Sequence, residues 1–468
     1  MDIKFVGACQ TVTGSMHLVR TEHGCILLDC GMFQGKRRQS HELNRNLPLP
    51  VKDIVATVLS HAHIDHSGTI PLLVKRGYAG PIYSTPATRD LATVMLADSA
   101  AIQEQDARYL NRKAKKKGLD IEPAEPLYDE HDVLEAIGRF HSVPYGFPTY
   151  LTPKVKLTFL DAGHVLGSAI VVLDIEEQGR TRRVVFTGDL GRVNMPILED
   201  PVVPEDAEML IMESTYGDRL HDDIGKMDDD LADVIARTHK RGGKVIIPSF
   251  ALERAQELVY ALRALREEGR LPKIPVYVDS PLTVKITDVF KLHPECYDQE
   301  TRELLKGRSS PFEFPELRYT QSVDDSKAIV ADKQPMIVIS ASGMCEVGRI
   351  CHHLRSIIED DKNTVLIVGY QAQHTLGRRL VEKRRRVKIF GVERDRRAKV
   401  VVMNGFSAHA DQQDLLDYAT QCRDKGGKLK PIALVHGDLK PQKVLAGKLA
   451  DLGFDRPIIP ESGDTLGL

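Results

Sequence analysis

Residues 59–68 read LSHAHIDHSG, so that three histidines and one aspartate lie within six consecutive positions. The apolar run 54–59 precedes them and is typical of a buried strand. His61 and His63 are two residues apart, and both side chains therefore project to one side of an extended backbone. Imidazole and carboxylate groups are ligands that suit zinc and similar divalent metals. An exposed histidine-rich loop is the alternative, but the density of ligand-type residues favours a strand end built around metal, with enough ligands for two ions.

Two later segments place one more ligand-type residue each behind a predicted strand. His164 lies in DAGHVLGS after the strand pattern VKLTFL, and Asp189 lies in FTGDLG after RRVVF. Taken alone, each fits an ordinary structural or exposed loop residue. Ligand sites of α/β proteins gather just beyond the carboxyl ends of strands. We therefore expect both side chains to join the residues at 61–66.

The order of predicted elements indicates an insertion. A chain of 468 residues suggests two or three domains, or one large fold with an insertion. Short strands separated by turns fill the first 215 residues, and residues 86–117 read as one long helix that Gly118 ends. Strands and helices then alternate from about residue 222, as in a mostly parallel α/β sheet. After Gly405 the first pattern returns, so the middle region looks inserted.

Bulk composition excludes little. The net charge is only −2, so binding to a polyanion has to come from local clusters of basic residues. No apolar run approaches the roughly 18 residues of a membrane span, and no signal peptide is visible at the N-terminus. Seven cysteines without a CxxC pair support neither a disulfide framework nor a thiolate zinc finger. We expect a cytoplasmic protein with no membrane contact.

The motifs together resemble a known family. Asp29 in LLDCG, the HxHxDH segment, His164 and Asp189 are similar to the four metal-site motifs of the metallo-β-lactamase superfamily. Three further residues resemble motifs of its β-CASP nuclease branch: Glu213 in MESTYG, His409 in GFSAHAD and His436 in LVHGD. The resemblance implies an α/β fold, an αββα sandwich carrying an inserted parallel-sheet β-CASP domain. The implied limits are 1–215 and 396–468 for the sandwich and 216–395 for the insertion.

The same resemblance implies two zinc ions per chain and a role for each ligand. One metal would be held by His61, His63 and His164, and the other by Asp65, His66 and His436, with Asp189 bridging the two. Asp29 would accept a hydrogen bond from a ligand imidazole and so fix its tautomer. The alternative for Asp29 is an ordinary carboxylate at a strand end.

The implied activity is zinc-dependent hydrolysis of RNA phosphodiester bonds, as an endonuclease, a 5′→3′ exonuclease or both, in RNA processing or decay. A pair of metals activates water as hydroxide for such reactions. The expected catalytic residues are Asp65, His409, which would protonate the leaving 3′ oxygen, and Glu213, which would orient His409.

RNA is favoured over DNA because family members that process RNA carry a histidine at the position of His436. The alternatives are a DNA nuclease of the same branch, a small-molecule metallo-hydrolase acting on thioesters or lactams, and an inactive scaffold subunit. A homodimer is also expected from the family.

Substrate contacts are harder to predict. Arg254, after PSF, is the best single candidate for phosphate binding, and the loop SASGMCEVGR offers Ser340 and Ser342. His374 is a further candidate, whereas His352 and His353 fit structural or exposed positions. Residues 383–399 and 108–117 are strongly basic and would add affinity for phosphates. Either basic run also fits a solvated face.

Overall fold

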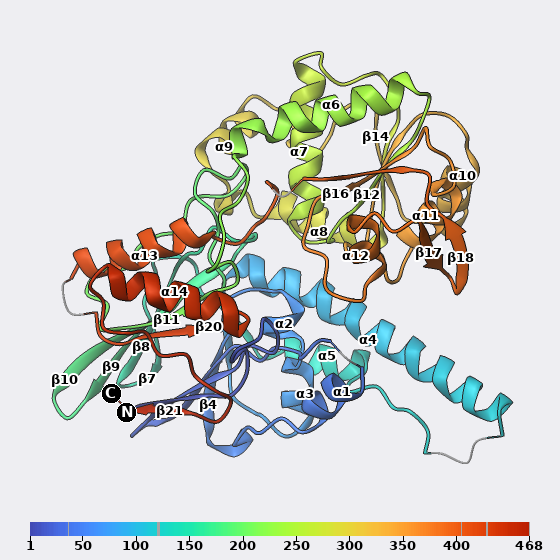
Figure 1. Ribbon diagram of the computed structural model, residues 1–468. Helices are drawn as coiled ribbons and strands as arrows, with labels where there is room; N and C mark the ends of the chain where they lie inside the picture. Colours follow the sequence, from blue (N-terminus) through green and yellow to red (C-terminus); the bar gives the residue numbers. More distant parts are fainter. Residues whose placement is uncertain (36, 119–121, 404, 427–428, 468) are drawn as a thin grey trace. The chain divides into compact units, whose positions relative to one another are not determined.

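The computed structural model describes residues 1–35, 37–118, 122–403, 405–426 and 429–467. The chain divides into two compact units (Figure 1). The first unit comprises residues 1–193, 200–220 and 409–468, and the second comprises 194–199 and 221–408. The second unit is therefore inserted in the sequence of the first, as the order of predicted elements indicates.

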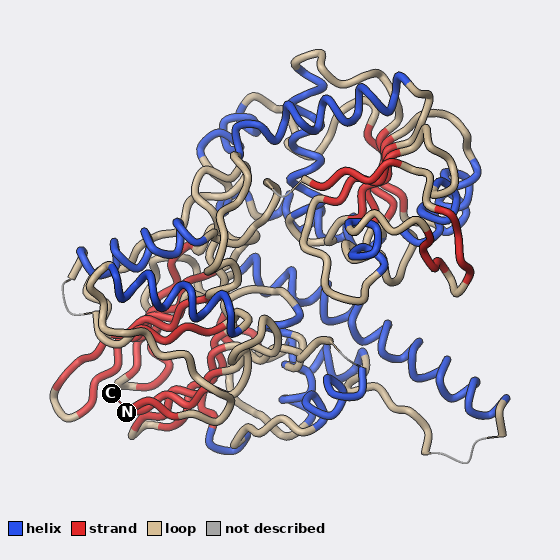
Figure 2. The backbone as a smooth tube through the Cα atoms, in the orientation of Figure 1, coloured by secondary structure: helices blue, strands red, loops and turns tan. Residues whose placement is uncertain are grey.

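Two mixed sheets form the first unit (Figure 2). One has seven strands in the order β21 (Thr465–Gly467), β1 (Asp2–Phe5), β2 (His17–Thr21), β3 (Gly24–Leu28), β4 (Ile54–Val58), β5 (Ile82–Ser84), β6 (Phe140–Ser142). The other has six strands in the order β20 (Ile432–Val435), β11 (Met209–Glu213), β10 (Arg180–Phe186), β9 (Ala169–Glu177), β8 (Val155–Asp161), β7 (Thr149–Thr152). The C-terminal strands β21 and β20 each form one edge of these sheets, and β21 pairs with the N-terminal strand β1.

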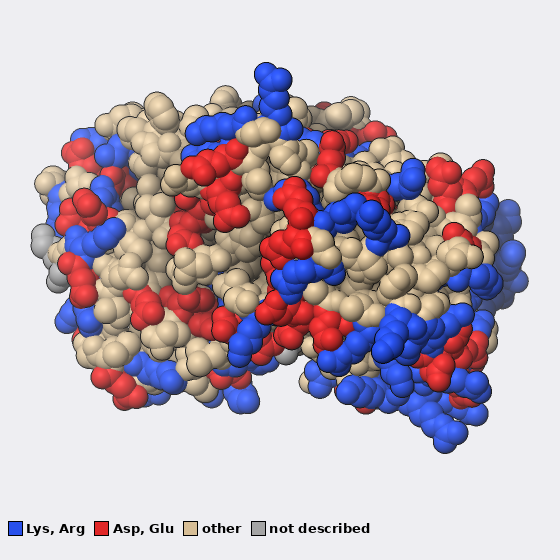
Figure 3. Space-filling model, turned by 90° about the horizontal axis from the view of Figure 1, so that it is seen from above, with Lys and Arg blue, Asp and Glu red and all other residues tan. Residues whose placement is uncertain are grey.

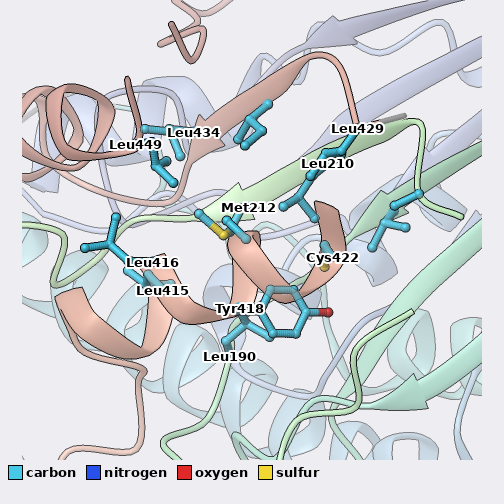
Figure 4. Close-up of a cluster of buried hydrophobic side chains, with 14 of the residues drawn as sticks. Leu190, Leu210, Met212, Leu415, Leu416, Tyr418, Cys422, Leu429, Leu434 and Leu449 are labelled. Carbon is cyan, nitrogen blue, oxygen red and sulfur yellow. The ribbon is translucent and has the colours of Figure 1, made fainter. Parts of the chain in front are cut away.

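The core of the first unit has two apolar layers. Alternate residues of both sheets, such as Ile26 and Val171, form one buried cluster between the sheets. The opposite face of the six-stranded sheet packs through Leu210 and Met212 against α13 (Gln412–Asp424) and α14 (Leu439–Asp451) (Figure 4). The remaining helices of this unit precede β6 in the sequence: α1 (Arg37–Arg45), α2 (Ile64–Ser67), α3 (Ile70–Lys75), α4 (Pro86–Lys116) and α5 (Glu130–Ile137). This is the αββα sandwich that the motifs imply.

The long helix α4 confirms the prediction for residues 86–117. Its start is set by Thr85, whose side chain accepts a hydrogen bond from the Thr88 backbone N–H at 3.2 Å, and by Pro86 in the first turn. Lys113, Lys115 and Lys116 occupy its last turn, where cations interact favourably with the helix dipole. Within the described residues, neither α4 nor any other helix is long and apolar enough to cross a membrane.

An all-parallel sheet organises the second unit, as predicted. Its order is β14 (Leu317–Thr320), β13 (Val276–Asp279), β15 (Ile337–Ser340), β12 (Val245–Pro248), β16 (Thr364–Ile367), β19 (Lys399–Val402). The helices are α6 (Met227–Lys240), α7 (Arg254–Glu267), α8 (Pro281–Leu292), α9 (Gln299–Lys306), α10 (Val323–Ala331), α11 (Ile350–Ile357) and α12 (Leu376–Val381). A separate two-stranded hairpin consists of β17 (Arg386–Ile389) and β18 (Val392–Asp395).

Candidate metal centre

Three neighbouring parallel strands position one side of the candidate site. β10, β11 and β20 pair in parallel, so their carboxyl ends meet at one edge of the six-stranded sheet. Asp189 follows β10, Glu213 is the last residue of β11, and His436 follows β20 directly. The turn after β4, in the other sheet, contributes the segment 61–66. The fold therefore brings together His66 and His436, which are 370 positions apart in the sequence.

One group of ligand atoms comes from three histidines and Asp189. His63 Nδ1 lies 3.1 Å from His61 Nε2 and 3.4 Å from His164 Nε2. The Asp189 Oδ2 atom lies 3.6 Å from both His61 Nε2 and His164 Nε2. Four ligands around a tetrahedral zinc with bonds of about 2.1 Å are separated by about 3.4 Å. The spacing of this group therefore fits a tetrahedral metal ion.

A second group lies on the other side of the Asp189 carboxylate. His66 Nε2 is 3.3 Å from His436 Nε2, and His436 Nε2 is 3.7 Å from Asp65 Oδ2. The Asp189 Oδ1 atom lies 3.4 Å from His66 Nε2 and 3.1 Å from His436 Nδ1. One oxygen of Asp189 thus faces each group, which is the arrangement of a carboxylate shared by two ions.

The Asp189 carboxylate tests whether this site fits a cation. The residue is 2% exposed, and its Oδ1 atom accepts no hydrogen bond from any described residue. A buried carboxylate oxygen without a donor is costly unless a positive charge lies next to it. The facing imidazole nitrogens supply the nitrogen ligands that borderline divalent metals prefer. The residues present therefore fit a divalent metal.

The protonation states of the site suit coordination in most positions. Burial lowers the pKa of His61 well below its usual value and that of His63 to about 4, so both rings are neutral at pH 7. Although burial raises the pKa of Asp65, the hydrogen bond and charge of His436 lower it to about 2. For His66, burial is outweighed by Asp189 and Asp29, which raise its pKa well above the usual value. Metal binding displaces protons from such a ring.

Asp29 contacts a ligand-type histidine, as the resemblance implies. Its Oδ2 atom accepts a hydrogen bond from His66 Nδ1 at 2.6 Å, which leaves Nε2 facing the second group. The carboxylate also accepts hydrogen bonds from the Ser60 backbone N–H at 2.8 Å and from the Ser15 hydroxyl at 3.1 Å. Asp29 and His436 both have positive φ, 56° and 47°, a strained conformation that clusters at functional sites. Asp29 therefore fixes the orientation of the His66 ring.

His409 lies beside the candidate ligands with one nitrogen held by a carboxylate. Its Nδ1 atom is 3.2 Å from Glu213 Oε1, and Glu213 is fully buried and also accepts a hydrogen bond from the Leu190 N–H at 2.7 Å. Burial lowers the pKa of His409, but the charges of Glu213 and Asp189 outweigh it and raise the pKa to about 9. The His409 side chain is 23% exposed, so a protonated imidazole can reach a ligand in the site.

Two residues of the site have no counterpart among the sequence predictions. The Ser60 hydroxyl donates to Asp29 Oδ2 at 3.0 Å and lies 3.1 Å from His61 Nδ1. The Thr215 hydroxyl lies 3.2 Å from His436 Nδ1 and donates to the His436 carbonyl at 3.1 Å. Both touch a ring that carries a candidate ligand atom. The one available signal was their position, directly before His61 and two residues after Glu213.

The predicted substrate-binding residues all belong to the second unit. Arg254 is only 7% exposed and pairs with Glu257 at 3.0 Å. The buried Ser340 hydroxyl donates to the Asp279 carbonyl at 2.8 Å, and the Ser342 hydroxyl donates to the Val347 carbonyl at 3.4 Å. His374 is exposed and has a φ of 71°. Three of these four side chains are thus occupied by contacts within the protein.

Three segments of the chain match known protein families. Residues 10–223 match the metallo-beta-lactamase superfamily, and residues 255–380 match the Beta-Casp domain. Residues 393–460 match the Zn-dependent metallo-hydrolase RNA specificity domain.

Similar proteins extend over almost the whole chain. Ribonuclease TTHA0252 of Thermus thermophilus is 36% identical over 449 residues, 95% of either chain. Transcription termination factor FttA of Methanosarcina mazei is 32% identical over 93% of this chain and 66% of its own length. A crystal structure of an Enterococcus faecalis protein of unknown function shares the fold, with a TM-score of 0.54 at 15% identity over all of this chain and 99% of that one.

Proposed function

The chain belongs to the metallo-β-lactamase superfamily, in its β-CASP form, and we propose that it hydrolyses RNA phosphodiester bonds with a binuclear zinc centre. Metal-dependent hydrolysis of RNA agrees with the match to an RNA specificity domain and with the ribonuclease among the relatives. The observation that carries the binuclear proposal is the Asp189 carboxylate, with one oxygen toward each group of ligand atoms.

The proposed ligands form the same two groups that the distances between the ligand atoms define. His61, His63 and His164 would hold one zinc, Asp65, His66 and His436 the other, and Asp189 both. When bound, such a pair supplies positive charge for the phosphoryl oxygens and lowers the pKa of water. Asp29 keeps the Nδ1 proton of His66 on its own side of the ring, so that Nε2 is free to coordinate. Ser60 and Thr215 restrain the rings of His61 and His436 in the same way.

His409 is proposed as the general acid. Glu213 orients its ring through Nδ1 and, with Asp189, stabilises the protonated form. The remaining nitrogen can donate a proton to the departing 3′ oxygen of RNA, because the side chain is partly exposed. Proton transfer of this kind contributes about 10²- to 10⁴-fold to the rate. Arg254, Ser340, Ser342 and His374 stay predicted substrate contacts.

The test separates metal binding from proton transfer. Purified His409→Ala protein should retain about two zinc ions per chain but cleave a labelled RNA about 10²- to 10⁴-fold more slowly. His239→Ala, which changes an exposed histidine of the second unit outside every proposed site, is the matched control and should cleave at the wild-type rate. A wild-type rate for His409→Ala would remove the proposed acid. Wild-type protein without bound metal would remove the binuclear centre.

The same assay distinguishes the rival substrates. Wild-type protein should cut an RNA faster than the DNA of the same sequence, and should not hydrolyse a thioester or a lactam. Faster cleavage of DNA would favour a repair-type nuclease. The homodimer, the domain limits and the cytoplasmic location also stay predictions.

A further inference from the structure

The hairpin β17–β18 presents an aromatic side chain where a small polar residue is usual. Its two-residue turn is Phe390–Gly391, with φ of 51° and 79°, between the paired residues Ile389 and Val392. Positive φ at both central positions defines a type I′ turn, which strongly favours Asn or Asp followed by Gly. A bulky residue in this conformation is an outlier. Phe390 is nevertheless 53% exposed at the tip, so the fold does not use it to fill the core.

The Phe390 ring is held in place by helix α11. His352 lies with its ring centroid 4.6 Å from that of Phe390, and the Arg355 guanidinium lies 5.6 Å from the Phe390 ring centroid. Both helix residues are exposed. A histidine and an arginine against one aromatic ring restrict its motion and surround it with positive or polar groups. More than half of the Phe390 surface nevertheless stays exposed.

The surrounding surface has an excess of cations. Residues 378–399 contain eleven lysines and arginines against three acids, Glu382, Glu393 and Asp395. Each acid is paired with an arginine of the same segment, through Arg378, Arg384 or Arg386. Five exposed cations have no carboxylate within 4 Å in the part of the chain that the structure describes: Lys383, Arg385, Lys388, Arg397 and Lys399. Figure 3 shows Lys and Arg side chains gathered on the side where Figure 1 places β17 and β18.

Two of these cations lie at the end of the hairpin opposite to Phe390. Arg385 and Arg397 lie at the open end of the hairpin, where the Arg396 N–H donates to the Arg385 carbonyl at 2.8 Å. The four residues of β17 lie between Arg385 and Phe390, so five steps of about 3.3 Å separate the two by about 17 Å. Stacked nucleotides repeat every 3.4 Å along a strand. The hairpin is therefore long enough for several nucleotides between the aromatic tip and the cations.

We infer that the hairpin surface, comprising Phe390, His352, Arg355 and the five unpaired cations, binds single-stranded RNA. This inference rests on the proposed function, since it takes RNA as the substrate. Phe390 stacks on a base, and the cations contact successive phosphates. Proteins that bind single strands without sequence preference combine these two features, an aromatic platform and a basic track. The hairpin surface would thus hold a part of the RNA that is not being cut.

The aromatic part of the inference is tested by binding. Full-length protein in EDTA, which prevents cleavage, is titrated into a fluorescein-labelled unstructured RNA of 20 nucleotides. Phe390→Ala should weaken binding about 5- to 150-fold, and Phe390→Trp should restore it, because a larger ring still stacks. Leu292→Ala, at a side chain that is 69% exposed in the same unit, is the matched control and should bind as the wild type does. Unchanged binding by Phe390→Ala would overturn the stacking role.

The cationic part is tested by salt dependence. Replacing Lys383, Arg385 and Arg397 with glutamine should lower the slope of log Kd against log salt concentration by about 2, since each phosphate contact contributes about 0.7 for a single strand. The matched control replaces Lys285, Lys306 and Lys333, which are also exposed and lack a carboxylate partner among the described residues, and should keep the wild-type slope. Equal slopes for the two triple variants would overturn the phosphate contacts.

Failure of this inference and failure of the proposed function give different results. Hairpin variants should hydrolyse bis(p-nitrophenyl) phosphate, a phosphodiester that has no nucleotide chain for the hairpin surface to hold, at the wild-type rate in zinc. Hairpin variants that bind the RNA like the wild type overturn the inference even if the wild type cleaves RNA. A change in self-association without a change in RNA binding would identify a protein interface instead, and would also overturn it. Wild-type protein that binds the RNA but cleaves nothing in zinc contradicts only the proposed function.

Discussion

Each unit of the molecule contains a buried histidine–aspartate pair with the same separation. In the first unit, His66 Nδ1 lies 2.6 Å from Asp29 Oδ2, and in the second, His353 Nε2 lies 2.6 Å from Asp279 Oδ2. All four residues are at most 1% exposed. Both carboxylates also accept hydrogen bonds from serine, Asp29 from Ser15 and Asp279 from Ser326. As isolated contacts the two pairs are nearly indistinguishable.

The two pairs differ in the residues that surround them. The free nitrogen of His66 faces His436 and Asp189 at 3.3 and 3.4 Å, so the ring belongs to a group of ligand atoms. Asp279 instead accepts a hydrogen bond from Arg349 Nη1 at 2.7 Å, and among the described residues neither Asp279 nor His353 joins a group of three or more metal-ligand side chains. A buried histidine–aspartate pair thus indicates function only when the second ring nitrogen also faces ligands. The pair of the second unit joins β13 to α11.

Substituting the histidine of each pair should give the largest difference in RNA cleavage between the two units. His66→Ala removes a proposed ligand, and we expect RNA cleavage to fall by about 10³-fold or more, because metals supply several kcal/mol of transition-state stabilisation. Bound zinc should fall from about two to about one ion per chain. His353→Gln, which keeps a hydrogen-bond donor near Asp279, should retain both ions and cleave within about twofold of the wild type. Zinc content and RNA cleavage are measured for both variants. Equal losses in the two variants would contradict the predicted difference between the pairs.

Substituting Asp279 should affect stability alone. Asp279→Asn leaves Arg349 and His353 without their buried carboxylate, a change that costs about 3 kcal/mol. The chain has no tryptophan, so hydrogen exchange is the better probe, read from the backbone amides of β13 and α11. Zinc content should not change. If Asp279→Asn loses zinc while its amides stay protected, the second pair is not a purely structural one.

The corresponding change in the first unit should affect metal affinity. Asp29→Asn keeps the size of the side chain but no longer accepts a charged hydrogen bond from His66. Partners of ligand histidines typically change metal affinity 10- to 100-fold. We expect zinc to be lost at lower chelator concentrations, and RNA cleavage to return when zinc is added in excess. If Asp29→Asn binds zinc with wild-type affinity, Asp29 has only a structural role, as we expect for Asp279.

The sequence predicted the first pair better than the second, because of the density of ligand-type residues around His66. Four such residues in six positions are uncommon away from a metal site, whereas His353 lies on a helix beside another histidine. No spacing rule relates His66 to His436, which is 370 residues away, and that link came from the family resemblance. Ser60 and Thr215 escaped prediction because serine and threonine are common near strand ends, and only their tertiary contacts distinguish them.

The fold was predictable where hydrophobic periodicity is strong and less so elsewhere. The helix at 86–117 and the parallel sheet of the insertion follow from local patterns. The closing strand β21 has only three residues, and its pairing with β1 joins the two ends of the chain. The hairpin β17–β18 was hidden inside the basic run 383–399, since basic residues alternate with only two buried residues in β17. Short strands at sheet edges bury too little to leave a pattern.

The smallest expected effect is the loss of stability at low pH around the Asp279–His353 pair. Burial raises the pKa of Asp279, but hydrogen bonds from His353, Ser326 and Arg349 outweigh it and lower the pKa below the ordinary value near 3.8. A depressed carboxyl pKa contributes stability that is complete above the unfolded value and disappears as the pH falls through the folded value. Protection of β13 and α11 should therefore decline in the wild type between about pH 5 and pH 3.

Over the same range Asp279→Asn should show a weaker decline in protection, because it has no carboxyl group to protonate at this position. The measurement is hydrogen exchange corrected for the intrinsic rate at each pH, with Asp29→Asn as the matched control that keeps the wild-type decline in these elements. Parallel curves for wild type and Asp279→Asn would mean that Arg349 and His353 gain nothing from the negative charge of Asp279. The pair would then be held together by packing, and the two units would differ in the origin of their pairs as well as in their surroundings.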